Sequence, residues 1–262
     1  MKNSNSGLFA AIIIVVEVTI AILFYKFVLG NPDNFVGGDP ANHPLQGNYF
    51  GIVYKGGFIV PILIAMLMIV ITFSIERLIT IGRAKGRGNV KTFVQKIKHL
   101  IASNNISQAI AECDKQKGSV ANVVKAGLVK YNDLAKNSSI EPDKKVVLIQ
   151  KDIEETTQLE MPMLEKNLVI LATIVSIATL LGLLGTVMGM IKAFAAMATA
   201  GAPDAVALAN GISEALINTA LGIGTSALAI IFYNYFTTRI DSITYGIDEA
   251  GYSIVQAYSS SH

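Results

Sequence analysis

Leu168–Ile191 reads LVILATIVSIATLLGLLGTVMGMI, and this stretch decides the fold. It contains no charged residue, and as a helix it is long enough to cross a bilayer. Helical periodicity puts Thr179, Gly182, Thr186 and Gly189 on one face. A membrane helix that reserves one face for small and hydroxyl residues contacts protein or water there rather than lipid. We therefore expect the function to lie on this face.

The composition of the whole chain is that of a membrane protein. Of its 262 residues, 52% are hydrophobic and 15% are charged, whereas soluble domains carry about 25% charged residues. The net charge of +2 is too small to indicate nucleic acid as a partner. A single cysteine, Cys113, excludes an internal disulfide, and we interpret it as an ordinary cytosolic thiol. Neither a cofactor nor a metal site is predicted.

Three further apolar stretches complete the predicted topology. Leu8–Leu29 and Phe58–Ile81 are predicted to be the first two spans, and Ile212–Phe236 the fourth. The third span is expected to continue as helix to about Ala200, before an outer turn at Gly201–Asp204. The predicted fold class is an all-α polytopic membrane protein with about four transmembrane helices. Long helices are expected to extend from the membrane into a cytoplasmic helical domain.

Basic residues set the expected orientation of the chain in its membrane. The second span is followed by a run of six basic residues without an acidic one, so by the positive-inside rule this end is cytoplasmic. Both termini are then cytoplasmic, and the Gly-, Pro- and Asn-rich loop Asn31–Gly57, expected to be irregular, is external. The basic residues of the run are Arg83, Lys85, Arg87, Lys91, Lys96 and Lys98.

The first span has two interpretations. A cleaved signal peptide is one, but Glu17 within the apolar run and Lys26 near its end favour a retained helix. Glu17 is costly in lipid and is expected to face protein. It is either a proton or partner site or, as we favour, a protonated or hydrogen-bonded packing residue.

The chain between the second and third spans is predicted to be helical and cytoplasmic. Its apolar residues recur at helical spacing, Ser107 is a candidate helix start, and Gly118 and Asn137–Pro142 are predicted breaks. Its acidic residues are expected on helix surfaces rather than in a metal site. The predicted divisions are residues 1–57, 58–81, 82–166, 167–236 and a cytoplasmic tail, 237–262.

The fourth span repeats the pattern of the third. One face of it carries small or polar residues at helical spacing. Thr186 lies six residues before Lys192, and Thr219 lies seven residues after Ile212, so both hydroxyls are expected about 10 Å below the outer boundary. Two antiparallel helices thus present threonines at matching depth. The residues of the repeated face are Ala215, Thr219, Gly222, Ser226 and Tyr233.

These spacings alone leave two interpretations open. Small faces pack helices closely, and membrane threonines often bond the carbonyl four residues earlier, so the faces can serve packing alone. Alternatively, they line a polar ion path. Glu214 is expected either in the first turn of a helix, where the helix dipole favours an anion, or as a proton entry or exit group at the rim. Lys192 is expected to extend to the headgroups.

Several motifs resemble one known family. The run Leu181–Met190, LGLLGTVMGM, resembles the signature of the MotA/TolQ/ExbB proton-channel family. Ile212–Leu216, ISEAL, followed by Asn218–Gly222, NTALG, and by Tyr233-Asn234 resembles the last membrane helix of the same family, and Glu76-Arg77 is also similar to it.

The likeness covers roughly Phe58–Arg239 and is closest to the ExbB and TolQ branch. It implies a homopentamer around a central pore, which encloses a dimer of an ExbD- or TolR-like partner with one membrane helix bearing an aspartate. A TonB- or TolA-like protein would carry the work to the outer membrane. By this resemblance Thr186 and Thr219 line the ion path and Glu214 lies near it. The first span is additional to the three-helix plan of typical ExbB proteins.

The sequence therefore predicts a subunit of a motor driven by the proton gradient. The alternative is a structural membrane scaffold whose small faces only pack helices. An enzyme is not expected, because the chain has neither a G-x-S-x-G nor an H-E-x-x-H motif. Whether the ion is H⁺ or Na⁺, and whether the system is of the TonB or Tol type, stays open.

Overall fold

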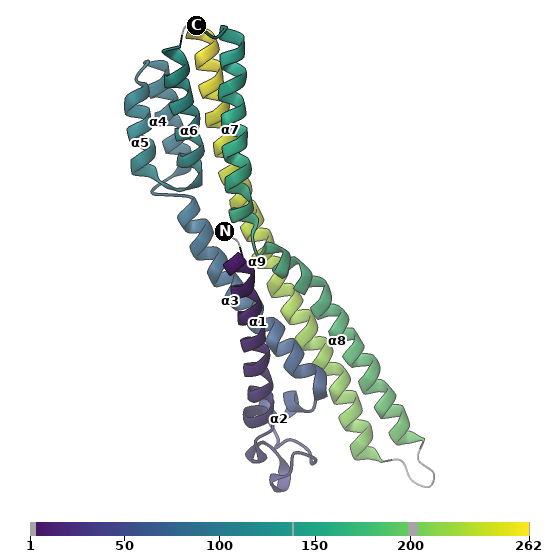
Figure 1. The fold of residues 1–262 in the computed structure, drawn as a ribbon. Helices are drawn as coiled ribbons and strands as arrows, with labels where there is room; N and C mark the ends of the chain where they lie inside the picture. Colours follow the sequence, from purple (N-terminus) through teal and green to yellow (C-terminus); the bar gives the residue numbers. More distant parts are fainter. Residues whose placement is uncertain (1–3, 138, 199–203, 262) are drawn as a thin grey trace. The chain divides into compact units, whose positions relative to one another are not determined.

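The structure, a computed structural model, describes residues 4–137, 139–198 and 204–261. Within these ranges the regular secondary structure is helical, with one isolated β-bridge between Phe35 and Pro44 (Figure 1). Four helices are long and apolar enough to cross a membrane, and each overlaps one of the four predicted spans. These observations confirm the all-α, polytopic class. The candidate spans are Ala10–Leu29, Gly57–Ala84, Leu168–Met197 and Ala205–Ser260.

The chain divides into two compact units, which we describe separately. The first, here called the membrane unit, comprises Met1–Ser74 and Ile170–Tyr233. The second, the bundle unit, comprises Ile75–Val169 and Asn234–His262. Helices α3 (Val60–Ala84) and α9 (Ala205–Ser261) contribute long segments to both units, and α8 (Leu168–Met197) contributes its first two residues to the bundle unit.

The amino-terminal part of the membrane unit, with the loop Asn31–Gly57, is more regular than predicted. Helix α1 (Ser4–Leu23) continues into the π-helical turn η1 (Phe24–Leu29). The loop beyond it contains helix α2 (Tyr49–Tyr54), which starts where the side chain of Asn48 accepts a hydrogen bond from Gly51 N. Local side-chain bonds of this kind supply the regularity, and overall Gly and Pro content does not reveal them. The short helices of this region are η2 (Pro32–Asn34), η3 (Val36–Gly38) and η4 (Gly57–Ile59).

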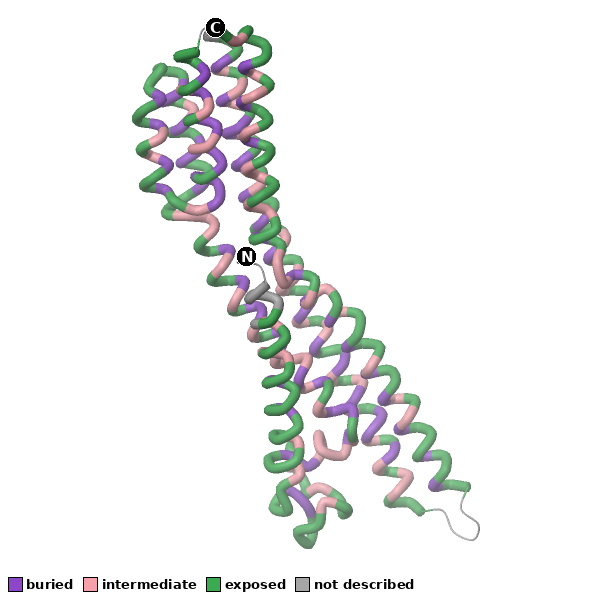
Figure 2. Tube along the Cα trace, in the orientation of Figure 1, coloured by how far each residue is buried: buried purple, intermediate pink, exposed green. Residues whose placement is uncertain are grey.

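The bundle unit packs four helices and the carboxyl-terminal part of α9 side by side (Figure 1). The buried residues of these helices are mostly apolar, and Figure 2 shows buried and exposed residues alternating along each helix, as expected for helices that bury one side. Both predicted breaks occur: Lys117 and Gly118 have φ of +56° and +82°, and a new helix begins at Pro142. The predicted start at Ser107 is displaced by one residue, to Ile106. The four helices are α4 (Val90–Ala102), α5 (Ile106–Gln116), α6 (Gly118–Ala135) and α7 (Pro142–Glu165).

The remaining helices differ in length from the predicted spans. Helix α8 covers Leu168–Met197, and the expected outer turn falls largely outside the described residues. Helix α9 begins at Ala205, seven residues before the predicted start, because the carboxylate of Asp204 accepts hydrogen bonds from Val206 N and Ala207 N, both at 3.0 Å. It continues as helix through the segment predicted as a tail. Apolar residues in that segment are buried at helical spacing, and they include Ile240, Ile243, Ile247 and Ile254.

Candidate functional site

Helices α8 and α9 approach closely through glycines on their facing sides. A Cβ atom added at Gly182 would lie 2.9 Å from the carbonyl oxygen of Asn218, and one at Gly189 would lie 2.6 Å from that of Gly211. In the opposite direction, a Cβ at Gly222 would lie 2.6 Å from the carbonyl oxygen of Ala178. Real Cβ atoms do not tolerate such distances, so the glycines bring the two backbones together.

At the centre of this contact the hydroxyls of Thr186 and Thr219 are hydrogen-bonded to each other. Thr186 Oγ1 also lies 3.1 Å from the carbonyl oxygen of Gly182 and 3.3 Å from that of Ala215. Thr219 Oγ1 lies 3.1 Å from the same Ala215 oxygen. Both threonines are half-buried. A hydroxyl carries one hydrogen and two lone pairs, so the pair can donate to a carboxylate or accept from a carboxylic acid.

The other residues of the two predicted faces divide into two groups. Ala215 is buried and supplies the shared carbonyl, and Ser226 donates a 2.6 Å hydrogen bond to Val175 O on α8. These residues belong to the helix contact. Thr179 does not, because it is exposed and its hydroxyl donates to Val175 O within its own helix at 3.3 Å. Tyr233 is half-buried.

Glu214 and Lys192 have different surroundings from those predicted. Glu214 lies nine residues beyond the start of α9, so it is not in the first turn and the helix dipole does not explain it. Its two carboxylate oxygens each accept a 2.7 Å hydrogen bond from Lys192 Nζ, instead of that ammonium extending to the headgroups. The Glu214 side chain is 8% exposed and the Lys192 side chain 52%. A buried carboxylate is thus neutralised by a cation that reaches it from the surface.

Asn218 is a buried polar residue of this site to which the sequence assigned no role. It is fully buried, its Nδ2 donates a 2.7 Å hydrogen bond to the carbonyl oxygen of Gly56, and its side chain packs where Gly185 lacks a Cβ. Its Oδ1 has no hydrogen-bond partner in the described part of the chain. The sequence feature that could have identified Asn218 is its side-chain amide within an apolar span, because a polar group in such a span requires a partner.

Glu17 of α1 is buried, as expected for a carboxyl that faces protein. Its carboxyl lies beside Thr72 of α3, and its Oε2 has no hydrogen-bond partner in the described part of the chain. The interpretation of Glu17 as a packing residue stays a prediction. Across residues 4–137, 139–198 and 204–261, no group of three His, Cys, Asp or Glu residues is placed to hold a metal ion.

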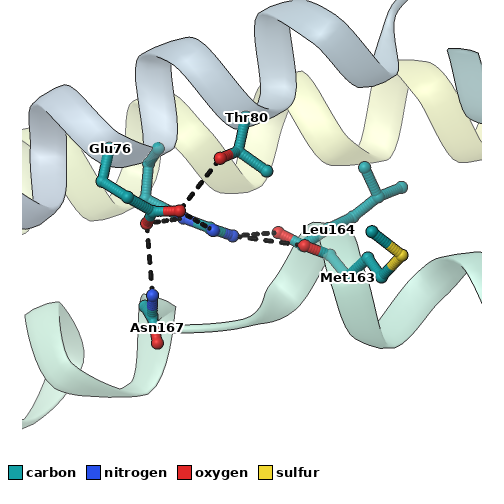
Figure 3. A network of polar contacts seen from close by, with 6 residues as sticks. Glu76, Thr80, Met163, Leu164 and Asn167 are labelled. Carbon is teal, nitrogen blue, oxygen red and sulfur yellow. Dashed lines mark hydrogen bonds and ion pairs between the residues drawn. The ribbon is translucent and has the colours of Figure 1, made fainter. Parts of the chain in front are cut away.

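The bundle unit contains another polar cluster, in which Arg77 of α3 contacts several residues; Figure 3 labels Glu76, Thr80, Met163, Leu164 and Asn167 of this cluster. Arg77 is 1% exposed, and it donates hydrogen bonds to the carbonyl oxygens of Leu164 at 3.1 Å and Met163 at 3.3 Å. It also pairs with the carboxylate of Glu76 at 2.5 Å. Thr80 and Asn167 in turn donate to that carboxylate. The guanidinium therefore caps the last turn of α7, whose carbonyls have no partner within the helix.

Comparison with known proteins identifies the family. The model of the MotA/TolQ/ExbB proton channel family matches residues 115–249, just over half of the chain. The matched segment includes Thr186 and Thr219, all of α8, the part of α9 up to residue 249 and the Lys192–Glu214 pair.

Individual relatives agree with this match. The chain is 32% identical to the Tol-Pal system protein TolQ of Pseudomonas aeruginosa over 52% of this chain and 58% of that protein. It is 27% identical to a putative biopolymer transport protein ExbB homolog of Methanothermobacter thermautotrophicus, over 74% of this chain and 66% of the relative. It is 39% identical to the biopolymer transport protein ExbB of Salmonella typhimurium, over 28% of this chain and 30% of that protein. The matched part thus spans less than two thirds of each relative. The chain belongs to the MotA/TolQ/ExbB proton channel family and is close to its ExbB and TolQ members.

Proposed function

We propose that this chain is the channel subunit of a motor driven by the proton gradient across the bacterial inner membrane. In this proposal Thr186 and Thr219 line the ion path, and a partner's membrane helix supplies the group that takes up and releases the proton. The observation that carries the proposal is the direct contact between these two hydroxyls, close to an ion pair in which Lys192 neutralises Glu214.

The charge inventory of the two helices supports a titrating group from outside the chain. Residues 168–197 and 205–236 contain two charged side chains, Lys192 and Glu214. These two are paired with each other. A carboxyl group that cycles between protonated and ionised forms needs neighbours that stabilise both forms without trapping one of them in an ion pair. The paired hydroxyls have this property, and Glu214 with its lysine lies closer to the outer end of the path.

The proposed assembly follows the family resemblance. Five copies of the chain surround a dimer of an ExbD- or TolR-like protein whose single membrane helix carries an aspartate, and both termini of the chain are cytoplasmic. A TonB- or TolA-like protein transmits the motion to outer-membrane processes such as transport. Large apolar residues on the outward sides of α8 and α9 are available for lipid and for neighbouring subunits; Leu183 is 59% exposed and Leu216 is 65% exposed.

The structural scaffold is the second candidate, and one observation favours it. Each threonine hydroxyl lies 3.1 Å from the carbonyl four residues earlier in its own helix, which is the geometry of a hydroxyl that serves packing alone. The two candidates differ in whether the hydroxyls are needed once packing is preserved.

The decisive experiment is the double substitution Thr186→Val/Thr219→Val, which keeps the side-chain shape and removes both hydroxyls. A motor subunit loses gradient-dependent function while it still assembles with its partner, measured by outer-membrane uptake or envelope integrity and by co-purification. Thr186→Ser/Thr219→Ser restores the hydroxyls and part of the function. Thr179→Val, outside the helix contact, is the matched control and leaves function unchanged. If the double valine variant retains full function, the chain acts as a scaffold and the proposal fails.

A further inference from the structure

The bundle unit contains a cavity of about 500 Å³ that the proposed motor does not use. Three helices enclose it: the end of α3, the start of α4 and the part of α9 that follows Tyr233. Its inner wall is made of apolar side chains, and each of them is at most 8% exposed. Gly246 lets α9 approach α4, because a Cβ there would lie 2.6 Å from Val90 Cγ1. The buried wall consists of Ile81, Val90, Val94, Phe236 and Ile243.

The cavity also has an excess of positive charge. Lys85, Lys91 and Arg239 line it, and none of them forms an ion pair with any residue that the structure describes. Glu249 is the acidic residue of the lining, and Lys98 neutralises it at 2.6 Å. The cavity is therefore cationic and is suited to an anion.

Apolar and basic residues are separated along the helix axes. Leu78 on α3 precedes Lys85, the residue that directly follows this helix, by about 10 Å along the helix axis. On α9, Tyr235 precedes Arg239 by one turn. Leu78 and Tyr235 belong to the ends of the second and fourth spans, and they are 46% and 43% exposed. The Arg239 guanidinium lies over the Tyr235 ring, 5.1 Å from its centroid. The cavity thus has an apolar side toward the membrane and a basic side beyond it, as an amphiphile with an anionic head requires.

We propose that this cavity binds the headgroup of an anionic phospholipid from the cytoplasmic leaflet. The phosphate contacts Lys85, Lys91 and Arg239, and the acyl chains follow Leu78 and Tyr235 into the bilayer. The inference uses the proposed orientation of the chain, with this end of α3 on the cytoplasmic side, and does not depend on the ion path. Such a lipid would fix the depth at which α3 and α9 leave the membrane.

The chain contains no tryptophan, so one introduced indole reports on this site alone. Tyr235→Trp retains an aromatic ring under Arg239. The full-length variant is placed in phosphatidylcholine nanodiscs that contain a small fraction of lipid with brominated acyl chains, which quench indole fluorescence. We expect brominated phosphatidylglycerol to quench more strongly than brominated phosphatidylcholine at the same fraction. Each basic residue removed is expected to lower the preference for phosphatidylglycerol about fivefold. Leu78→Trp is a second reporter at an exposed position if the first variant folds poorly.

Matched variants separate the cavity from general surface charge. Lys85→Gln/Arg239→Gln is expected to abolish the preference for phosphatidylglycerol. The control Arg83→Gln/Lys136→Gln removes the same amount of charge from exposed positions outside the cavity, and it is expected to leave that preference unchanged. Gly82→Phe tests occupancy without a change in charge. Gly82 lines the cavity, and a Cβ there meets no atom within 4 Å, so a phenyl ring can enter the space and exclude the lipid.

Three results would overturn the proposal. Equal quenching by the two brominated lipids would mean that the cavity does not select an anionic head. An unchanged preference in Lys85→Gln/Arg239→Gln would place the lipid elsewhere. Displacement of brominated phosphatidylglycerol by an equal concentration of soluble glycerol 1-phosphate would identify a free phosphate compound as the ligand. All three are binding measurements, so they are independent of whether the motor function is correct.

Discussion

The ammonium of Lys192 on α8 lies 2.7 Å from each carboxylate oxygen of Glu214 on α9. The pair joins α8 to α9, and its two opposite charges neutralise each other. The carboxylate is buried, whereas the lysine is half-exposed, so the two residues are not equivalent. Without the lysine, the carboxylate would be a buried charge with no partner. Without the carboxylate, the lysine ammonium would be solvated by water.

This asymmetry predicts the order of stability among variants of the pair. Lys192→Met is expected to lower the free energy of unfolding by about 1–2 kcal/mol, less than for a fully buried pair because the lysine is half-exposed. Lys192→Met/Glu214→Gln is expected to recover most of that loss. Thermal unfolding of the purified protein in detergent provides the measurement, with Lys192→Arg as the charge-preserving control. A double variant no more stable than Lys192→Met would show that the pair is unimportant.

Two glycines of α9 provide a test of the helix contact. Gly222→Ala places a Cβ 2.6 Å from the Ala178 carbonyl oxygen and is expected to cost about 1–3 kcal/mol as α8 and α9 move apart. Gly224→Ala meets no atom within 4 Å and is expected to be neutral or to stabilise the helix by up to about 1 kcal/mol. Unfolding temperatures and the yield of assembled protein would distinguish them. Equal effects of both substitutions would contradict the close contact.

The cluster around Arg77 predicts a local effect on α7. Arg77→Met removes the donor that satisfies the carbonyls of Leu164 and Met163, and it leaves Glu76 without its cation. We expect a loss of about 2–4 kcal/mol and faster amide hydrogen exchange in the last turn of α7. Arg77→Lys should recover little, because an ammonium lacks the planar fork of the guanidinium. Arg83→Met, on an exposed side of the same helix, is the control and should leave exchange in α7 unchanged.

Cys113 gives a pH-dependent prediction for the bundle unit. The thiol is 2% exposed, and burial, assisted by Asp114, raises its pKa from the ordinary value of 9.0 to about 12. The folded state therefore retains a proton that the unfolded state releases. The contribution to stability is complete below pH 9 and is lost as the pH rises toward 12. Labelling with a thiol reagent should be slow in the native protein at pH 8 and rapid after denaturation, and Cys113→Ala should remove this part of the alkaline instability. Rapid native labelling at pH 8 would contradict a buried thiol.

Part of the site could be read directly from local sequence. The spans, their glycine-rich faces and the threonines at matching depth all follow from residue spacing within single helices. The start of α9 was wrong by seven residues because the apolar pattern of the fourth span does not record the cap at Asp204. That error assigned Glu214 to a first turn, and its partner on the other helix was consequently missed.

The sequence by itself determined the fold class, the number and approximate positions of the spans, and the family resemblance. A lipid environment forces each apolar segment to satisfy its backbone hydrogen bonds internally, so composition alone specifies helices there. The tertiary structure decided which polar groups meet. Asn218 reaches Gly56, Arg77 reaches Leu164, and Thr186 meets Thr219. These contacts depend on how helices that are distant in the chain are rotated and offset against each other. The glycines allow two helices to approach closely, but which backbone each glycine meets is decided only when both helices are in place.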